Sequence, residues 1–295
     1  MAKIGLVTVL YKSDDVLEGF YKSLSVQGFK DYRLYIIDNS PSDETDKLLA
    51  ALHDEYFIPA YTHVKNISNN GVAKGNNQGI ELALKDNCDY VLLLNNDIEF
   101  NKITLLSEIV ELAEEKQENI VIPKIFYYNT RTLWMAGGHM HNYKATVSHI
   151  GVDEKDGSKF NNSGYFTYAP TCFMLISKEV FNKIGVMDEK YFVYYDDTDF
   201  IKRAYKSGFK IFYMPNLEVF HKVSSSTGGG ETLFSIYYLN RNRIYFIRKN
   251  LSFPQRQIST IYTLVTRAML LFKYKKAERT KLIQAVIDGY KIKSL

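Results

Sequence analysis

The chain has 295 residues, 46% of them hydrophobic and 24% charged, which is ordinary for a soluble globular protein of one large domain or two small ones. Its net charge of +4 is unevenly spread, because residues 240–295 contain thirteen Lys and Arg against two acidic residues, about +11, and residues 1–239 carry about −7. An acidic body argues against a nucleic-acid-binding core, and a basic tail is typical of a segment that meets an anionic surface.

Strands and helices alternate over the first 122 residues. Residues 4–10, 32–40 and 90–100 have the apolar runs of strands, 16–27 and 104–116 have helical spacing, and 40–52 combine a turn with a helix. Residues 69–84 form a glycine- and asparagine-rich loop that runs into a helix. This alternation predicts a mostly parallel sheet covered on both faces, with ligands bound beyond the carboxyl ends of the strands.

Polar residues follow these strands. Asp38 and Asp97 stand at strand ends, as does the polar loop after Leu10, so three strand ends are expected to converge on one crevice. A carboxylate such as Asp97 can hold Mg²⁺ or Mn²⁺, which in turn binds diphosphates, and Asp38 can accept a hydrogen bond from a base or a ribose. Each aspartate is equally explained as a helix cap or turn residue. The sequence has neither a G-x-x-x-x-G-K-[ST] nor a G-x-G-x-x-G motif, which disfavours a P-loop or dinucleotide fold.

The chain changes character after Pro123. "VIPKIFYYN", "TLWMAGGHMHN" and "ATVSHIGVDE" suggest short strands, and "FTYAPTCFMLISKEVFNKIG" suggests a strand followed by a helix. The glycine run 228–230 is a candidate hinge before a helical tail. We therefore predict a domain of residues 1–230, with halves of about 1–122 and 123–230, and a C-terminal helical module of residues 231–295.

Three aspartates gather in "YYDDTDFIKRAYKSGFKIFYMPNLEVFHK", residues 194–222. Clustered carboxylates are costly to desolvate and need cations or solvent nearby. Asp199 precedes Arg203 by four residues, the spacing of an ion pair on a helix. Asp196 and Asp197 precede or open that helix, where its dipole favours carboxylates. An acidic helix start without a catalytic role is the alternative explanation.

The order and spacing of these motifs carry a family resemblance. "VTVLYKSDDVLEGFYKSLSVQ", "YIIDNSPSDET", "NNGVAKGNNQGI", "LLLNNDIEF", "LWMAGGHM" and "GVMDEKYFVYYDDTDFIKRAYKSGFKIFYMPNLEVFH" occur in turn over about residues 3–250. Together they resemble inverting glycosyltransferases of the GT-A fold in glycosyltransferase family 2, and among these the bacterial rhamnosyl- and galactofuranosyltransferases. The resemblance implies an α/β fold, a mostly parallel mixed sheet flanked by helices, followed here by the C-terminal helical extension.

The resemblance also implies roles for single residues. It places Asp197 as the catalytic base with Asp196 beside it, and it assigns a Mn²⁺ or Mg²⁺ ion to Asp97 and His221. The residues implied in binding a dTDP- or UDP-sugar are Tyr11, Asp38, Asn70, Gly71, Asn77, Asn95 and Asn96. Two positions depart from the family pattern, because Asn95 replaces the first acid of the D-x-D motif and Asp196 replaces a longer glutamate.

Aromatic residues near these motifs are candidates for the acceptor site. Trp134 can stack on a sugar, although core packing explains it equally well, and Tyr194 and Tyr195 can line the same pocket or pack beside it.

The tail contains the amphipathic stretch "QISTIYTLVTRAMLLFKYKK". It is too short for a membrane span and Arg267 interrupts it, so it fits a helix on an anionic membrane surface, on the body or on a second copy of the chain. The apolar residues on one face are Ile258, Ile261, Tyr262, Val265, Met269 and Phe272.

Features of the whole chain predict a cytoplasmic protein. The N-terminal apolar run of about six residues is too short for a secretion signal. Cys88 and Cys172 match no metal or redox spacing and are expected to be buried free thiols in a reducing compartment. With a lipid-linked acceptor, we expect peripheral attachment at the inner face of the cell membrane.

The expected activity is metal-dependent inverting transfer of a sugar, L-rhamnose from dTDP-rhamnose first, to a growing cell-surface polysaccharide or lipid-linked glycan. The alternatives are transfer of galactofuranose or another hexose from a UDP-sugar, synthesis of a nucleotide sugar, and a catalytically silent nucleotide-sugar-binding or scaffold subunit. A nucleotidyltransferase usually carries a glycine-rich basic loop near its N-terminus, and "VTVLYKSDD" has none. Because Asn95 replaces an acid of the D-x-D motif, a catalytically silent subunit stays an alternative.

Overall fold

The computed structural model describes residues 2–58, 61–223 and 231–293, so the expected hinge at 228–230 lies outside the described residues. The strands are β1 (Ile4–Leu10), β2 (Tyr32–Asp38), β3 (Tyr61–Lys65), β4 (Tyr90–Leu94), β5 (Ile98–Glu99), β6 (Ile120–Tyr127), β7 (Leu133–Met135), β8 (Gly138–His141), β9 (Thr146–His149), β10 (Gly164–Phe166), β11 (Phe173–Ser177) and β12 (Ile211–His221). The helices are α1 (Asp14–Ser25), α2 (Glu44–Tyr56), α3 (Gly71–Lys85), α4 (Leu105–Lys116), α5 (Lys178–Ile184), α6 (Asp196–Lys206), α7 (Leu233–Asn250), α8 (Gln255–Lys273) and α9 (Lys276–Lys291), with short 3-10 helices at Ser158–Phe160 and Glu189–Tyr191.

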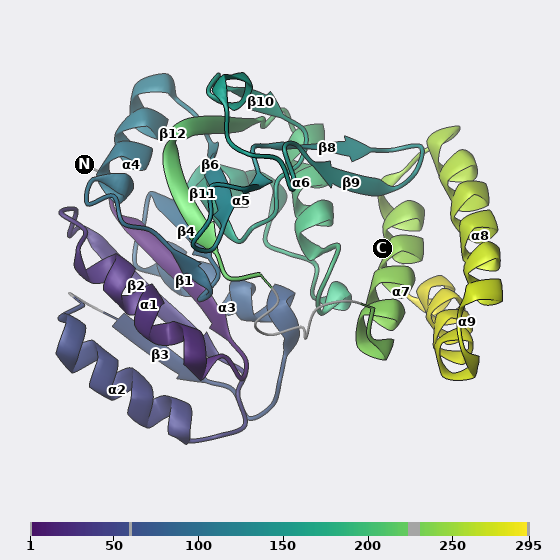
Figure 1. Ribbon diagram of the computed structural model, residues 1–295, viewed down its shortest axis with the longest axis horizontal. Helices are drawn as coiled ribbons and strands as arrows, with labels where there is room; N and C mark the ends of the chain where they lie inside the picture. The colour runs from purple at the N-terminus through teal and green to yellow at the C-terminus, as the bar shows by residue number, and fades with distance from the viewer. Residues whose placement is uncertain (1, 59–60, 224–230, 294–295) are drawn as a thin grey trace.

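One mixed sheet forms the centre of the molecule, with helices on its faces (Figure 1). Its strand order is β10-β12-β6-β11-β4-β1-β2-β3, with β5 beside β12 and β7 beside β6. Strands β3, β2, β1 and β4 are parallel, whereas β11 pairs antiparallel with both β4 and β6. The predicted mixed sheet flanked by helices is confirmed. Its four neighbouring parallel strands come from the first half of the chain, and β6 and β12 form a further parallel pair.

Helix α3 lies close against β1 because its glycines face the strand. A β-carbon on Gly75 would lie 2.7 Å from the Val9 side chain, and one on Gly79 would lie 2.3 Å from Val7. The segment expected to be a loop leading into a helix is therefore helical from Gly71 onward. Close packing on the strand outweighs the low helix propensity of its glycines and asparagines.

Strand β3 was not among the predicted elements. All five of its residues are half-buried, and "YTHVK" lacks the apolar run that marks a central strand. It pairs in parallel with β2 at the edge of the sheet and aligns Lys65 with Asp38. The strand thus brings a lysine to the edge where the polar strand ends meet.

The second half of the body adds a separate hairpin. Strands β8 and β9 pair only with each other among the described residues, and the hairpin reaches toward the C-terminal helices (Figure 1). Ala145, at its turn, is fully buried in one cluster with Tyr191 and with Tyr245, Phe246 and Ile247 of α7. Helix α7 is therefore packed into the body, while α8 and α9 lie beyond it.

Helix α8 turns its apolar side outward. Its buried residues are the small polar Ser259 and Thr263. The predicted apolar stripe is exposed, so docking of this stripe on the body is wrong: Ile258, Ile261, Tyr262, Val265, Met269 and Phe272 are between 38% and 87% exposed. None of the helices in the described part of the chain has both the length and the hydropathy needed to cross a membrane.

Candidate active site

The polar strand ends meet at the carboxyl edge of the parallel strands, as predicted. Strands β1 and β2 end in register, and the backbone N–H of Lys12 donates to Ser40 Oγ at 3.0 Å. Asn96, which follows β4, donates from Nδ2 to Ser13 Oγ at 2.5 Å. These bonds join the loops after β1, β2 and β4 into one surface.

Asp38 is fully buried within this surface. The Ser40 N–H donates to Oδ1 at 2.7 Å, Lys65 Nζ donates to Oδ2 at 2.9 Å, and His63 Nε2 lies 3.8 Å from Oδ2. Burial favours a higher pKa, but the hydrogen bonds from His63, Lys65 and Ser40 lower the pKa of Asp38 to about 2. An ionised Asp38 fixes the turn after β2, and its contact with a nucleoside stays a prediction, as does that of the half-buried Tyr11 and Asn70.

Asp38, Asp46 and His63 also have the spacing of metal ligands, since one ligand atom of each lies within 4.8 Å of the others. The Lys65 ammonium lies among them, 2.9 Å from Asp38 and 3.3 Å from Asp46. Because this lysine supplies the positive charge, we interpret the cluster as an ion-paired group of the fold.

Asn77 has structural contacts where ligand contacts were predicted. It is 2% exposed, its Nδ2 donates to the Met187 carbonyl and to Glu189 at 2.9 and 3.1 Å, and its Oδ1 accepts from the Met187 N–H at 2.9 Å. Gly71 has φ +79, and a β-carbon there would lie 2.4 Å from the Phe192 carbonyl oxygen. Both residues therefore position the segment before α6, and a ligand contact by Asn77 is corrected to this role.

A cavity of about 580 Å³ lies where the body meets α7 and α8. Of the predicted nucleotide-sugar residues in the described ranges, Asn95 is the one that lines it. All the predicted catalytic, metal and acceptor residues line it together: Asp97, Trp134, Tyr194, Tyr195, Asp196, Asp197 and His221. Residues from four separate parts of the sequence thus share one chamber.

Asp97 and His221 are brought together by the sheet. Strand β5 aligns Ile98 with His221, and the Lys222 N–H donates to the Asp97 carbonyl at 2.9 Å. His221 Nε2 lies 3.3 Å from Asp97 Oδ1, and the Trp134 ring meets the imidazole edge to face at 4.5 Å. His221 Nδ1 is buried and has no hydrogen-bond partner among the described residues. The Asp97 carboxylate and the Nε2 atom of His221 face each other in the cavity, and an oxygen and an imidazole nitrogen placed in this way can hold a divalent cation.

Asp196 and Asp197 are the first two residues of α6, as predicted. Asp197 Oδ2 accepts from the Tyr168 hydroxyl at 2.6 Å, and Oδ1 accepts from the Thr198 N–H at 2.5 Å. Burial and then the Asp197 charge raise the pKa of Asp196 to about 8. Burial also raises the pKa of Asp197, although the bonds from Tyr168 and Thr198 oppose the rise. The pair therefore holds a proton near neutral pH, with the negative charge favoured on Asp197.

The loop before this helix has an unusual backbone that α7 holds in place. Phe192, Tyr194 and Tyr195 all have φ between 62 and 66, a region that costs a non-glycine residue on the order of 1 kcal/mol or more. Asn242 of α7 is fully buried and donates from Nδ2 to the carbonyls of Tyr191, Val193 and Tyr194 at 2.8, 2.7 and 2.8 Å. These bonds aim Tyr194 and Tyr195 at the cavity.

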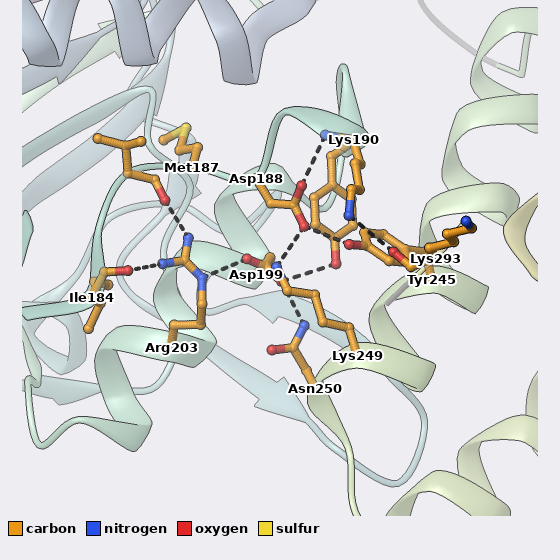
Figure 2. A network of polar contacts seen from close by, with 12 residues as sticks. Ile184, Met187, Asp188, Lys190, Asp199, Arg203, Tyr245, Lys249, Asn250 and Lys293 are labelled. Carbon is orange, nitrogen blue, oxygen red and sulfur yellow. Dashed lines mark hydrogen bonds and ion pairs between the residues drawn. The ribbon is translucent and has the colours of Figure 1, made fainter. Parts of the chain in front are cut away.

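Asp199 lies behind the cavity in a buried polar network that Figure 2 shows. Arg203 Nε donates to its Oδ2 at 2.8 Å, which confirms the predicted pair. Lys249 Nζ lies 2.8 Å from Oδ1, which also accepts from Asn250 at 2.7 Å. Lys249 reaches Asp188 as well, at 2.7 Å. The network ties α6, which begins with Asp196 and Asp197, to the end of α7.

Several residues of the cavity were not predicted. Tyr168, Arg243 and Arg267 line it, and His149 stacks on Tyr168 and meets Trp134 edge to face. The arginines come from α7 and α8, where their spacing suggested only a basic tail. Cys172 also lines the cavity, and both cysteines are buried and free, as predicted.

Fold and cavity together define a class: a glycosyltransferase of the GT-A fold, with two acids from α6 and the neighbouring Asp97 and His221 in one cavity at the edge of a mixed sheet. The family profile described as "Glycosyl transferase family 2" matches residues 6–185. That match covers more than half of the chain, so the chain belongs to glycosyl transferase family 2.

Two curated relatives match over most of their length. The chain is 26% identical over 278 residues to the low-salt glycan biosynthesis hexosyltransferase Agl10 of Haloferax volcanii, covering 91% of this chain and 83% of that protein. It is 25% identical over 238 residues to the dTDP-rhamnosyl transferase RfbF of Shigella flexneri, covering 75% of each.

Solved structures share the fold at low identity. Staphylococcus aureus TarS 1–349, in complex with UDP-GlcNAc, has a TM-score of 0.65 at 15% identity, with 98% of this chain and 81% of that chain covered. The chain spans 49% of a longer TarS chain. The mannosyltransferase PcManGT of Pyrobaculum calidifontis, in complex with GDP-Man and Mn²⁺, has a TM-score of 0.59 at 12% identity, with 98% and 87% covered.

Proposed function

We propose that the chain is an inverting glycosyltransferase that moves L-rhamnose from dTDP-rhamnose to a growing cell-surface polysaccharide or lipid-linked glycan. The observation that carries the proposal is the Asp196–Asp197 pair in one cavity with Asp97 and His221. The names of the two relatives, a hexosyltransferase and a dTDP-rhamnosyl transferase, support the sugar class and favour rhamnose.

Asp197 is the base in this proposal. The Tyr168 hydroxyl and the Thr198 N–H stabilise its ionised form, while Asp196, with a pKa of about 8, keeps its proton near neutral pH. A carboxylate whose pKa is raised toward the working pH is a more effective proton acceptor. The neighbouring protonated Asp196 spares the cavity a second negative charge next to a departing diphosphate.

The reaction forms one bond and breaks one. The acceptor hydroxyl gives its proton to Asp197 while its oxygen bonds to the anomeric carbon, and the bond from that carbon to the nucleoside diphosphate breaks with its electron pair on the leaving oxygen. Attack opposite the leaving group inverts the anomeric centre. Asp97 and His221 would hold the divalent cation, and the cation would neutralise the diphosphate charge. The ion would be Mn²⁺ or Mg²⁺, because carboxylate and water ligands suit both.

Replacement of Asp197 by asparagine tests the base. The amide cannot take the hydroxyl proton, so transfer is expected to fall by at least about a hundredfold while donor binding persists. Asp196→Asn should retain far more activity than Asp197→Asn, because asparagine resembles the neutral, protonated Asp196 that is already present. Normal turnover of Asp197→Asn, together with an inactive Asp196→Asn, would show that Asp196 and not Asp197 is the base.

The donor is tested with a panel of nucleotide sugars. We expect dTDP-rhamnose with Mn²⁺ to raise the melting temperature most and to be hydrolysed slowly without acceptor. UDP-galactofuranose is the second candidate, because the resemblance places His221 at a metal-ligating histidine of that group. Binding of a nucleotide sugar without hydrolysis or transfer would instead support the alternative function, a catalytically silent subunit, that the Asn95 substitution suggests.

We further propose that the exposed stripe of α8 binds the anionic inner face of the cell membrane. Apolar side chains turned to solvent lie next to Lys273, Lys275 and Lys276 on a tail of about +11. Burial of the stripe at a lipid surface would remove apolar area from water, and each basic residue near that surface adds on the order of 1 kcal/mol.

Replacing Lys273, Lys275 and Lys276 by glutamate tests this contact. The parent protein should bind vesicles containing anionic lipid in a salt-dependent way, and the variant should be released while donor hydrolysis in solution continues. A parent that never binds vesicles, with a variant that loses its oligomeric state, would make the stripe a contact between copies of the chain.

A further inference from the structure

Two arginines from the C-terminal helices reach the cavity of the catalytic pair. Arg243 of α7 is 4% exposed, and Arg267 of α8 is half-buried. One Nη of Arg243 donates to the Lys144 carbonyl of the β8–β9 turn. Arg267 donates from Nε to Asn240 Oδ1 at 2.6 Å and from Nη1 to Thr266 Oγ1 at 3.1 Å. These contacts hold both guanidinium groups against the wall of the chamber.

The partners of both arginines are uncharged. In the described parts of the chain no carboxylate lies within 4.0 Å of either guanidinium, and Arg243 Nε is buried without a hydrogen-bond partner. The guanidinium carbon Cζ of Arg243 lies 5.6 Å from the centre of the Tyr262 ring. Burial and then the Arg243 charge lower the pKa of Arg267. Arginine stays protonated in proteins, so the fold keeps two like charges close together without a neutralising acid.

The acids of the cavity do not compensate these charges. Asp197 directs its oxygens at Tyr168 and Thr198, and Asp196 has a high pKa from burial and the Asp197 charge. The cavity therefore has a cation-binding wall from the sheet, with Asp97 and His221, and an anion-binding wall from the helices, with Arg243 and Arg267. Planar guanidinium groups with free N–H donors match phosphate oxygens in charge and geometry.

We propose that Arg243 and Arg267 form a subsite for a phosphate or diphosphate group that the acceptor carries. This inference rests on the proposed function, because it names the chemical class of the acceptor: a glycan whose first sugars are linked to a lipid through phosphate. Arg267 supports the assignment by its position on α8. Ile258, in the exposed stripe, precedes it by nine residues, about two and a half helical turns, so the arginine and the stripe occupy opposite sides of one helix.

The test uses farnesyl diphosphate, a short and soluble isoprenoid diphosphate, with the protein saturated by UDP or dTDP and Mn²⁺. We expect saturable binding to the full chain. Arg243→Gln and Arg267→Gln should each weaken it at least about tenfold, because each removes charge-assisted hydrogen bonds to phosphate. Arg256→Gln is the matched control, since Arg256 lies exposed on α8 outside the cavity, and its affinity should equal that of the parent.

The lysine variants Arg243→Lys and Arg267→Lys separate charge from packing. They should retain most of the farnesyl diphosphate affinity that the glutamine variants lose. If the glutamine variants weaken UDP or dTDP tenfold and leave farnesyl diphosphate unchanged, the pair serves the donor and the acceptor assignment is overturned. If they bind both ligands like the parent, the arginines are structural and the subsite is overturned. Failure of the parent to hydrolyse any nucleotide sugar would contradict the proposed function. The binding of farnesyl diphosphate would still test the arginine subsite separately.

Discussion

Asp199→Ala is the sharpest test of how α6 is held in place. Asp199 is fully buried and receives bonds from Arg203 at 2.8 Å, Asn250 at 2.7 Å and Tyr191 at 3.1 Å, with Lys249 Nζ at 2.8 Å. Removing one member of a buried ion pair costs about 3–5 kcal/mol, because the partner charge stays buried. Lys249 keeps Asp188, and Arg203 keeps the Ile184 and Val186 carbonyls, so we expect the lower end, about 3 kcal/mol.

Urea unfolding at neutral pH measures this loss directly. Glu154→Ala is the matched control, because Glu154 pairs with Lys159 at the surface, where both side chains are about half exposed or more, and such pairs contribute about 1 kcal/mol or less. The free energies of unfolding, extrapolated linearly to zero urea, should differ between the two variants by roughly 2 kcal/mol, and the dependence on urea concentration should be the same for both. A loss in Asp199→Ala no larger than the control's would show that the network seen in Figure 2 does not stabilise the junction of α6 and α7.

Four further substitutions probe the site. Asp97→Ala and His221→Ala should each weaken Mn²⁺-dependent donor binding, as isothermal titration would report, and full activity in chelator would refute a metal at this pair. In the metal-free protein, Asp196 with its pKa of about 8 binds a proton that the unfolded chain releases near pH 4. Its contribution to stability is therefore complete below about pH 4 and is lost as the pH rises toward 8, by up to about 1.4 kcal/mol per pH unit. Asp196→Asn should remove this decline in urea titrations between pH 5 and 8, and an unchanged pH slope would contradict it. Asn242→Ala should lower the free energy of unfolding by about 1–3 kcal/mol and also reduce transfer, since three loop carbonyls lose their donor. A loss of stability with normal transfer would show that the loop does not need these hydrogen bonds for activity.

The sequence predicted the site best where residues act within one element. The apolar run 4–10, the i,i+4 spacing of Asp199 and Arg203, and the aspartates that open α6 are local patterns, and the structure confirms all three. The family resemblance carried the long-range part, since it paired Asp97 with His221, which the structure places 3.3 Å apart in one cavity.

The remaining features depend on contacts that no local pattern carries. Asn77 has the residue type of a ligand-binding loop, but tertiary packing gives its amide to Met187. Arg243 and Arg267 are two of thirteen basic residues in the tail of residues 240–295, and only the packing of α7 and α8 brings both to the cavity. The amphipathic pattern of α8 left open whether its apolar stripe lies on a membrane, on the body or on a second copy of the chain. The structure excludes the body, since Ser259 and Thr263 on the opposite side are the residues that α8 buries.

The two sides of α8 determine how far the reaction can take place from a surface that the helix touches. A helix with its side chains is about 10–12 Å across, so a surface that touches the outer stripe lies roughly that far from Arg267 on the inner side. With the stripe laid on lipid, the reacting hydroxyl must stand within a similar height of the bilayer. Such a height suits the first sugars attached to a lipid, whose hydroxyls stay near the headgroups, and it excludes the distant tip of a long extended polymer. On the proposed membrane contact, the thickness of a single helix would therefore select early steps of chain assembly over late ones.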